Sequence, residues 1–117
     1  MTIAASQASA TVDLSHERIG ATAGDHQVLV GGSGDVVQLT GGNETVRAPQ
    51  GGNTIATGAG NDVIGVGGAG NTVNAGAGQN WIGEWGNNDT VVLAAAGQGV
   101  DHLFGNLLTQ GNTLDFT

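Results

Sequence analysis

The chain of 117 residues has no cysteine, no lysine and no tyrosine, a single proline, and an aromatic content of only 3%. The absence of cysteine excludes a disulfide framework and any metal site built on thiolates. With two Phe and two Trp, the chain cannot fill a wide globular core. The sequence therefore predicts one domain with a thin core of small aliphatic side chains.

Positive charge is also scarce, because Arg18 and Arg47 stand against ten acidic residues, for a net charge of −8. Such a surface repels phosphate backbones, so we expect no nucleic-acid partner. No apolar run is long enough to cross a bilayer, so membrane insertion is not expected. Residues 1–10 lack a basic start and a sustained apolar segment, which argues against a Sec signal peptide.

What the chain has in abundance is glycine, with 23 residues, and these recur in phase with an aliphatic column. Counting in nines from Ile19 to Val100 meets a β-branched aliphatic residue at every step. The intervening core column is Val28, Val37, Val46, Ile55, Ile64, Val73, Ile82 and Val91. A fixed period indicates an internal repeat, whereas a flexible Gly-rich linker would have no such phase.

The true repeat is two nonapeptides, because alternate nonapeptides differ three residues before the aliphatic residue. That position holds Asp25, Asn43, Asn61 and Gln79 in one half, and Gly34, Gly52, Gly70 and Asn88 in the other. We predict an all-β fold, a right-handed parallel β-roll or β-solenoid with 18 residues per coil, two parallel sheets and end caps. Residues 1–23 would form an N-terminal strand or cap, 24–95 four coils, and 96–117 a C-terminal coil or cap.

One nonapeptide resembles a known family. The segment TGAGNDVIG, residues 57–65, is similar to the GGxGxDxUx repeat of the RTX family, whose parallel β-rolls bind calcium. The C-terminal segment resembles the ends of proteins exported by type I secretion, through Gly111, Leu114, Asp115 and Phe116. This resemblance implies a secreted, extracellular protein, exported in the bacterial manner without a Sec signal peptide, with Ca²⁺ as a candidate cofactor.

The candidate calcium ligands lie in the turns between predicted strands. One side of the roll would carry His26, Glu44, Asp62, Asn80 and Gln98, and the other Glu17, Asp35, Asn53, Asn71 and Asp89. Asp35, Glu44, Asp62, Asp89, Asn53, Asn61 and Asn80 are the candidate metal residues. Calcium requires six to eight oxygen ligands and carboxylates stack at few places, so an alternative is that amide ladders hold the turns without metal.

The outward-facing residues offer a second kind of site. Thr54, Thr72 and Thr90 repeat at 18 residues and resemble the flat threonine arrays of ice-binding solenoids, although threonine is also an ordinary strand residue. Trp81 and Trp85 suggest stacking on a glycan, or packing at a cap. The three histidines fall in different columns, and no catalytic constellation recurs, so we expect no enzyme activity.

Together these features predict a secreted structural repeat protein. Its open strand edges, without lysine to blunt them, favour head-to-tail self-assembly into an extracellular fibre, matrix or surface layer, possible calcium dependence included. The partner would then be the protein itself, as a homo-oligomer or filament. The alternative is a ligand-binding module, for ice through the threonines or for glycan through Trp81 and Trp85.

Overall fold

A computed structural model describes residues 2–5, 9–12, 18–21, 24–93, 98–105 and 111–116. The described residues form strands and turns, with no helix that is long and apolar enough to cross a membrane. The strands are β1 (Thr2–Ala5), β2 (Ser9–Val12), β3 (Arg18–Ala21), β4 (Gln27–Val30), β5 (Val36–Leu39), β6 (Thr45–Ala48), β7 (Thr54–Ala56), β8 (Val63–Val66), β9 (Thr72–Asn74), β10 (Gly78–Glu84), β11 (Thr90–Val92), β12 (Gly99–Gly105) and β13 (Thr113–Asp115).

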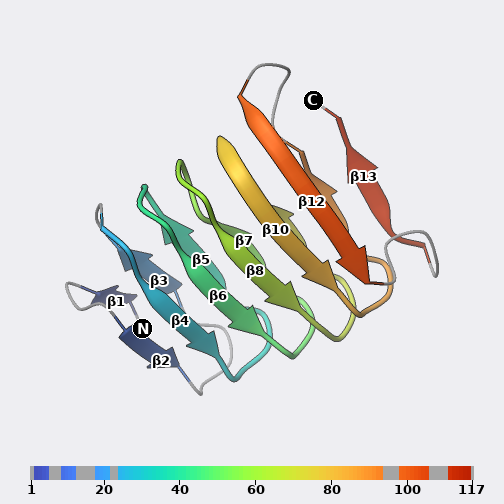
Figure 1. Ribbon diagram of the computed structural model, residues 1–117. Coiled ribbons are helices and arrows are strands. Elements are labelled where there is room, and N and C mark those ends of the chain that lie inside the picture. The colour runs from blue at the N-terminus through green and yellow to red at the C-terminus, as the bar shows by residue number, and fades with distance from the viewer. Residues whose placement is uncertain are drawn as a thin grey trace.

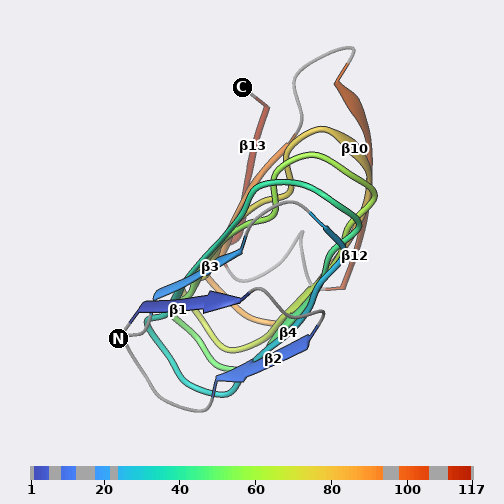
Figure 2. The same cartoon turned by 90° about the vertical axis from the view of Figure 1, so that its left-hand side faces the viewer.

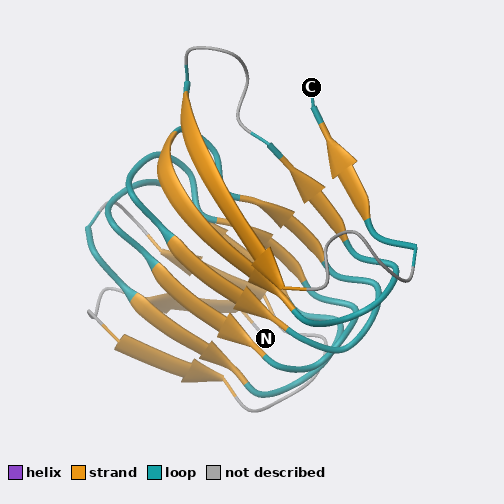
Figure 3. Ribbon diagram, turned by 45° about the vertical axis from the view of Figure 1, so that its right-hand side comes forward, coloured by secondary structure: helices purple, strands orange, loops and turns teal. Residues whose placement is uncertain are grey.

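The strands alternate between two parallel sheets. The odd-numbered strands form the seven-stranded sheet A in the order β1-β3-β5-β7-β9-β11-β13, and the even-numbered strands form the six-stranded sheet B from β2 to β12. Figure 1 shows this sequence of strands, with the two termini towards opposite ends of the stack. In Figure 2 successive coils overlie one another, and Figure 3 shows the two layers of strands joined by turns. The predicted β-solenoid with two parallel sheets is confirmed.

The register explains the repeat seen in the sequence. Ile64 pairs with Val46 on one side and with Ile82 on the other, in steps of one coil, so like residues stack on like residues. In sheet A, Ile55 lies in the same way between Val37 and Val73. Because a slip of one residue would turn every side chain to the opposite face, this aliphatic stacking specifies the register.

The core is a narrow double row of side chains between the sheets. All eight residues of the predicted core column from Val28 to Val91 are at most 3% exposed. The residue two positions after each of them also points inward, and this second row is made of Val30, Leu39, Ala48, Thr57, Val66, Ala75 and Glu84, with Leu93 partly buried. These short strands expose the residues between, as the β4 pattern of exposed and buried residues shows.

Glycine is required where neighbouring coils approach most closely. Gly60 has φ 146°, and a Cβ atom placed on it would lie 1.7 Å from the carbonyl oxygen of Gly42 in the preceding coil. Its N–H donates to the Ala77 carbonyl oxygen at 2.9 Å. A side chain here would prevent the backbones from stacking, which explains why glycine recurs once per coil at this corner.

The two ends of the chain continue the sheets. Strand β2 pairs with β4, and β1 pairs with β3, so residues before the regular repeats extend the stack. At the other end, Gly78 pairs with Gly99, an offset of 21 residues. The prediction that Val100 continues the core column is therefore wrong, because this longer step shifts the phase: Val100 is 55% exposed, and Leu103 pairs with Ile82 instead. Leu103 and Leu114 pack against the core.

Candidate functional site

A first polar column lines the corner before the strands of sheet B. His26, Glu44, Asp62 and Asn80 occupy it, and all four are buried. The backbone N–H of each donates to the side chain one coil further on: that of Glu44 to Asp62 Oδ1 at 2.8 Å, and that of Asp62 to Asn80 Oδ1 at 3.0 Å. The column is thus a ladder of hydrogen bonds that joins the coils and satisfies backbone donors at the turns.

A second buried column lies before the strands of sheet A. Asp35 donates its backbone N–H to Asn53 Oδ1, Asn53 donates to Asn71 Oδ1 and Asn71 to Asp89 Oδ1, at 2.9, 2.9 and 2.5 Å. The Asp89 N–H then donates to Asn112 Oδ1 at 2.8 Å, across an offset of 23 residues. Sequence periodicity missed Asn112 because this last step is longer than 18 residues.

The remaining candidate ligand, Asn61, belongs to a third ladder, on the exposed side of the turns. Here the direction is reversed, because each side chain accepts from the following coil: the N–H of Asn61 donates to Asn43 Oδ1 at 2.9 Å, and that of Gln79 to Asn61 Oδ1 at 3.0 Å. Asp25 begins this ladder by accepting from the Asn43 N–H at 2.7 Å. Asn61 therefore connects coils in the same way as the buried residues.

These donor sets do not match a calcium site. Both oxygens of Asp62 are engaged, Oδ1 by the Glu44 N–H and Oδ2 by the Thr57 hydroxyl at 2.6 Å, and Glu44 accepts from the N–H and Nδ1 of His26. Within the described ranges, no three His, Cys, Asp or Glu residues gather as metal ligands. Calcium requires six to eight oxygens, so calcium binding stays a prediction, and we derive no role from it. Glu17 lies outside the described residues.

Two buried carboxyl groups meet at the corner after β10. Glu84 accepts at Oε2 from Asn112 Nδ2 at 2.8 Å and at Oε1 from the Gly86 N–H, and it lies beside Asp89. Burial, together with the hydrogen bond and the like charge of Asp89, raises the pKa of Glu84 to about 7. The charge state of this corner therefore changes near neutral pH, next to the residue that ties β13 to the stack.

The outer face of sheet A carries the predicted threonine row. Thr54 pairs with Thr72, and Thr72 with Thr90, as the spacing predicts. The row continues to Thr113, which pairs with Thr90 in β13 and which the 18-residue period could not find. Four threonines in register form a flat polar strip, and its use as an ice-binding surface stays a prediction.

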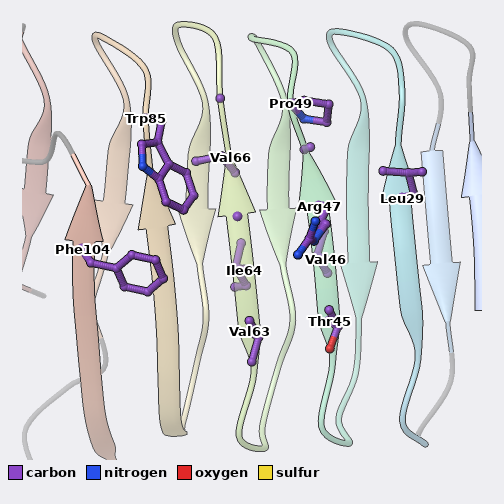
Figure 4. A pocket seen from close by; sticks show the side chains of 13 residues that line it. Leu29, Thr45, Val46, Arg47, Pro49, Val63, Ile64, Val66, Trp85 and Phe104 are labelled. Atoms are coloured by element: carbon purple, nitrogen blue, oxygen red, sulfur yellow. The ribbon is translucent and has the colours of Figure 1, made fainter.

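The outer face of sheet B is chemically different, because it holds an apolar groove of about 620 Å³ (Figure 4). The groove crosses the strands from Leu29 on β4, past Arg47 on β6, to Trp85 and Phe104. Trp85 meets Phe104 edge to face, with ring centroids 5.5 Å apart. Trp81 lies on the same face, stacked on His102 at 4.4 Å.

Comparisons with protein families, with curated proteins and with solved structures find no match. The functional assignment therefore depends on three structural features: the polar ladders, the ends of the two sheets, and the outer face of sheet B. The ladders use their polar atoms within the fold, as the bonds from Glu44 to Asp62 and from Asn53 to Asn71 show. The sheet ends and the outer face are the features available to partners.

Proposed function

We propose that this chain is a structural unit that self-assembles end to end into an extracellular fibre, matrix or surface layer. The observation that supports this most is the state of the sheet ends. Among the described strands, β1 and β2 at one end, and β12 and β13 at the other, have a neighbour on one side only. Such edges template pairing with another chain.

The hydrogen-bonding groups at the two ends are complementary in direction. Within the stack, the N–H groups of outward-facing residues point to the preceding coil: Thr45, Val63 and Trp81 donate to carbonyl oxygens there, each at 2.8 Å. Ser9 is in register with Gln27 and hence with Thr45, so its N–H faces the outer edge of β2. Inward-facing residues of β12 and β13 direct their groups the opposite way, as parallel pairing requires.

The strands at the N-terminal end also lack the features that blunt sheet edges. Strands β1 and β2 read TIAA and SATV, without charge or proline. Natural edge strands that stay unpaired carry charges, proline or bulges. Joining one end to the other end of the next subunit is a heterologous contact that does not close, so it produces a filament. The type I secretion-like segment at Gly111, Leu114, Asp115 and Phe116 supports an extracellular setting.

The experiment compares the full chain with two substitutions at one edge residue. Ser9→Pro removes the N–H that faces the outer edge of β2, and proline is tolerated at the first residue of an edge strand. Ser9→Ala keeps the N–H and serves as the matched control. In sedimentation velocity and negative-stain microscopy we expect filaments from the parent chain and Ser9→Ala, and mostly monomers from Ser9→Pro with unchanged circular dichroism. A parent chain that stays monomeric at high concentration would overturn the proposal.

A further inference from the structure

The exposed apolar side chains of this protein are gathered on one face. The large hydrophobic residues that are at least 42% exposed are Leu29, Val63, Trp81, Trp85, Val100, Phe104 and Phe116, and all but Phe116 belong to the strands of sheet B or follow one directly. The outer face of sheet A instead presents small polar side chains such as Thr54 and Asn74. Contiguous apolar surface confined to one face is typical of a binding site.

Two glycines make room for the groove on this face. Pairing places Arg47 beside Gly65, Gly65 beside Gly83, and Gly83 beside Phe104 in one outward-facing row. A Cβ atom on Gly83 would lie 2.4 Å from the Trp85 ring and 2.7 Å from the Phe104 ring, so the rings lie directly on the backbone there. Gly65 has ordinary contact space and leaves the floor of the groove open between Arg47 and Trp85.

The aromatic rings are exposed but held in place by one another. Trp81 and Trp85 are 52% and 56% exposed, yet Trp81 stacks on His102 with an interplanar angle of 18°, and Trp85 contacts Phe104 at 74°. The two tryptophans are four residues apart along β10 and its end, which in an extended strand is about 13 Å. The sheet thus presents two preorganised aromatic surfaces, which lowers the entropy that binding would cost.

We propose that this face binds a neutral, extended polysaccharide. Sugar rings have apolar C–H faces that stack on aromatic rings and hydroxyl edges that require hydrogen-bonding partners. The groove supplies both, since the Thr45 hydroxyl and the Arg47 guanidinium lie in its wall beside the apolar residues (Figure 4). From β4 to β12 the face crosses four strand spacings, about 19 Å, so the ligand is a chain rather than a single sugar.

Charge selects among polysaccharides. The chain carries a net charge of −8, and Arg47 is the one basic side chain that the groove presents. A polyanionic glycan would be repelled by the whole protein at ordinary ionic strength, whereas a neutral chain would not. A second copy of this protein is a poorer occupant, because the outer face of sheet A offers no large apolar side chain to fill the groove.

Intrinsic fluorescence tests the proposal, because the two tryptophans of the chain, Trp81 and Trp85, both lie at this face. The full-length protein is titrated with hydroxyethylcellulose as the neutral extended probe, with dextran as a flexible neutral probe and polygalacturonate as an anionic one. We expect a saturable emission change with hydroxyethylcellulose, a weaker change with dextran and none with polygalacturonate. Preference for polygalacturonate, or no change with any probe, would overturn the proposal.

Substitutions locate the binding. In affinity electrophoresis with hydroxyethylcellulose, Trp85→Ala should weaken retention about tenfold or more. Gly65→Ile should do the same by filling the floor of the groove without removing a ring, and Thr54→Ala on sheet A is the matched control that should leave retention unchanged. Equal retention of all variants would overturn the assignment to this face. So would an emission change that depends on protein concentration alone, since a second copy would then cover the groove.

Discussion

Truncation of Ile64 is the sharpest test of how this solenoid is held together. Its side chain is 1% exposed, lies in register between Val46 and Ile82, and faces sheet A across a core only two side chains deep. Ile64→Ala removes three carbon atoms, which is about 2.4 kcal/mol of transfer free energy at about 0.8 kcal/mol per methylene. The polar ladders at both corners keep the sheets apart, so a cavity remains and the total loss should reach about 3–4 kcal/mol.

The matched control is its neighbour Val63, also β-branched and on the same strand but 46% exposed on the outer face. Val63→Ala loses similar strand propensity without leaving a cavity, so we expect less than about 1 kcal/mol. Urea unfolding followed by far-ultraviolet circular dichroism, at a concentration where the protein is monomeric, gives both values. Equal losses for the two variants would refute the assignment of inward and outward faces.

Four further outcomes follow from the corners and the outer faces. Because the pKa of Glu84 is raised to about 7, the folded state holds more protons than the unfolded state between pH 4.5 and 7. Stability should therefore fall as pH rises through this window, by up to about 1.4 kcal/mol per pH unit, and Glu84→Gln should flatten the profile of urea midpoints. Asn53→Ala leaves the buried Asp35 N–H without its acceptor and should cost about 1–3 kcal/mol in the same assay, whereas Asn53→Asp should cost less. Since the oxygens of Glu44 and Asp62 accept hydrogen bonds within the fold, melting curves in EDTA and in millimolar Ca²⁺ should coincide, and a calcium-dependent rise in Tm would reveal a site. If the threonine row binds ice, Thr72→Lys should abolish thermal hysteresis, and a parent chain without hysteresis would remove that hypothesis.

The regular coils could be predicted from the sequence because one chemical rule repeats in them. A β-branched residue at every ninth position, with glycine in phase, leaves a two-sheet solenoid as the arrangement that buries the whole column. The alternation of Ala10, Val12 and Leu14 likewise predicted a strand, and β2 lies at Ser9–Val12. The amide ladders were foreseen as an alternative to metal, and Asn53 and Asn71 form such a ladder.

The irregular C-terminal coil could not be predicted in the same way. The steps to β12 and β13 are longer than 18 residues, so Val100, Asn112 and Thr113 fall out of phase with the columns that they leave or join. The pairing of Trp81 with His102 depends on the longer step to β12 and has no periodic signal. The meeting of Glu84 with Asp89 is equally hidden, because two adjacent corners of one coil come together only through the path of the turn.

The central claim is that the coils of one subunit continue into the next along the solenoid axis. Fibre diffraction from aligned filaments of the full chain tests it most directly. If strands stack across each junction as they do within the protein, a reflection at about 4.8 Å will lie on the meridian. Filaments whose 4.8 Å reflection lies on the equator, or a protein that forms no filaments at all, would contradict the account.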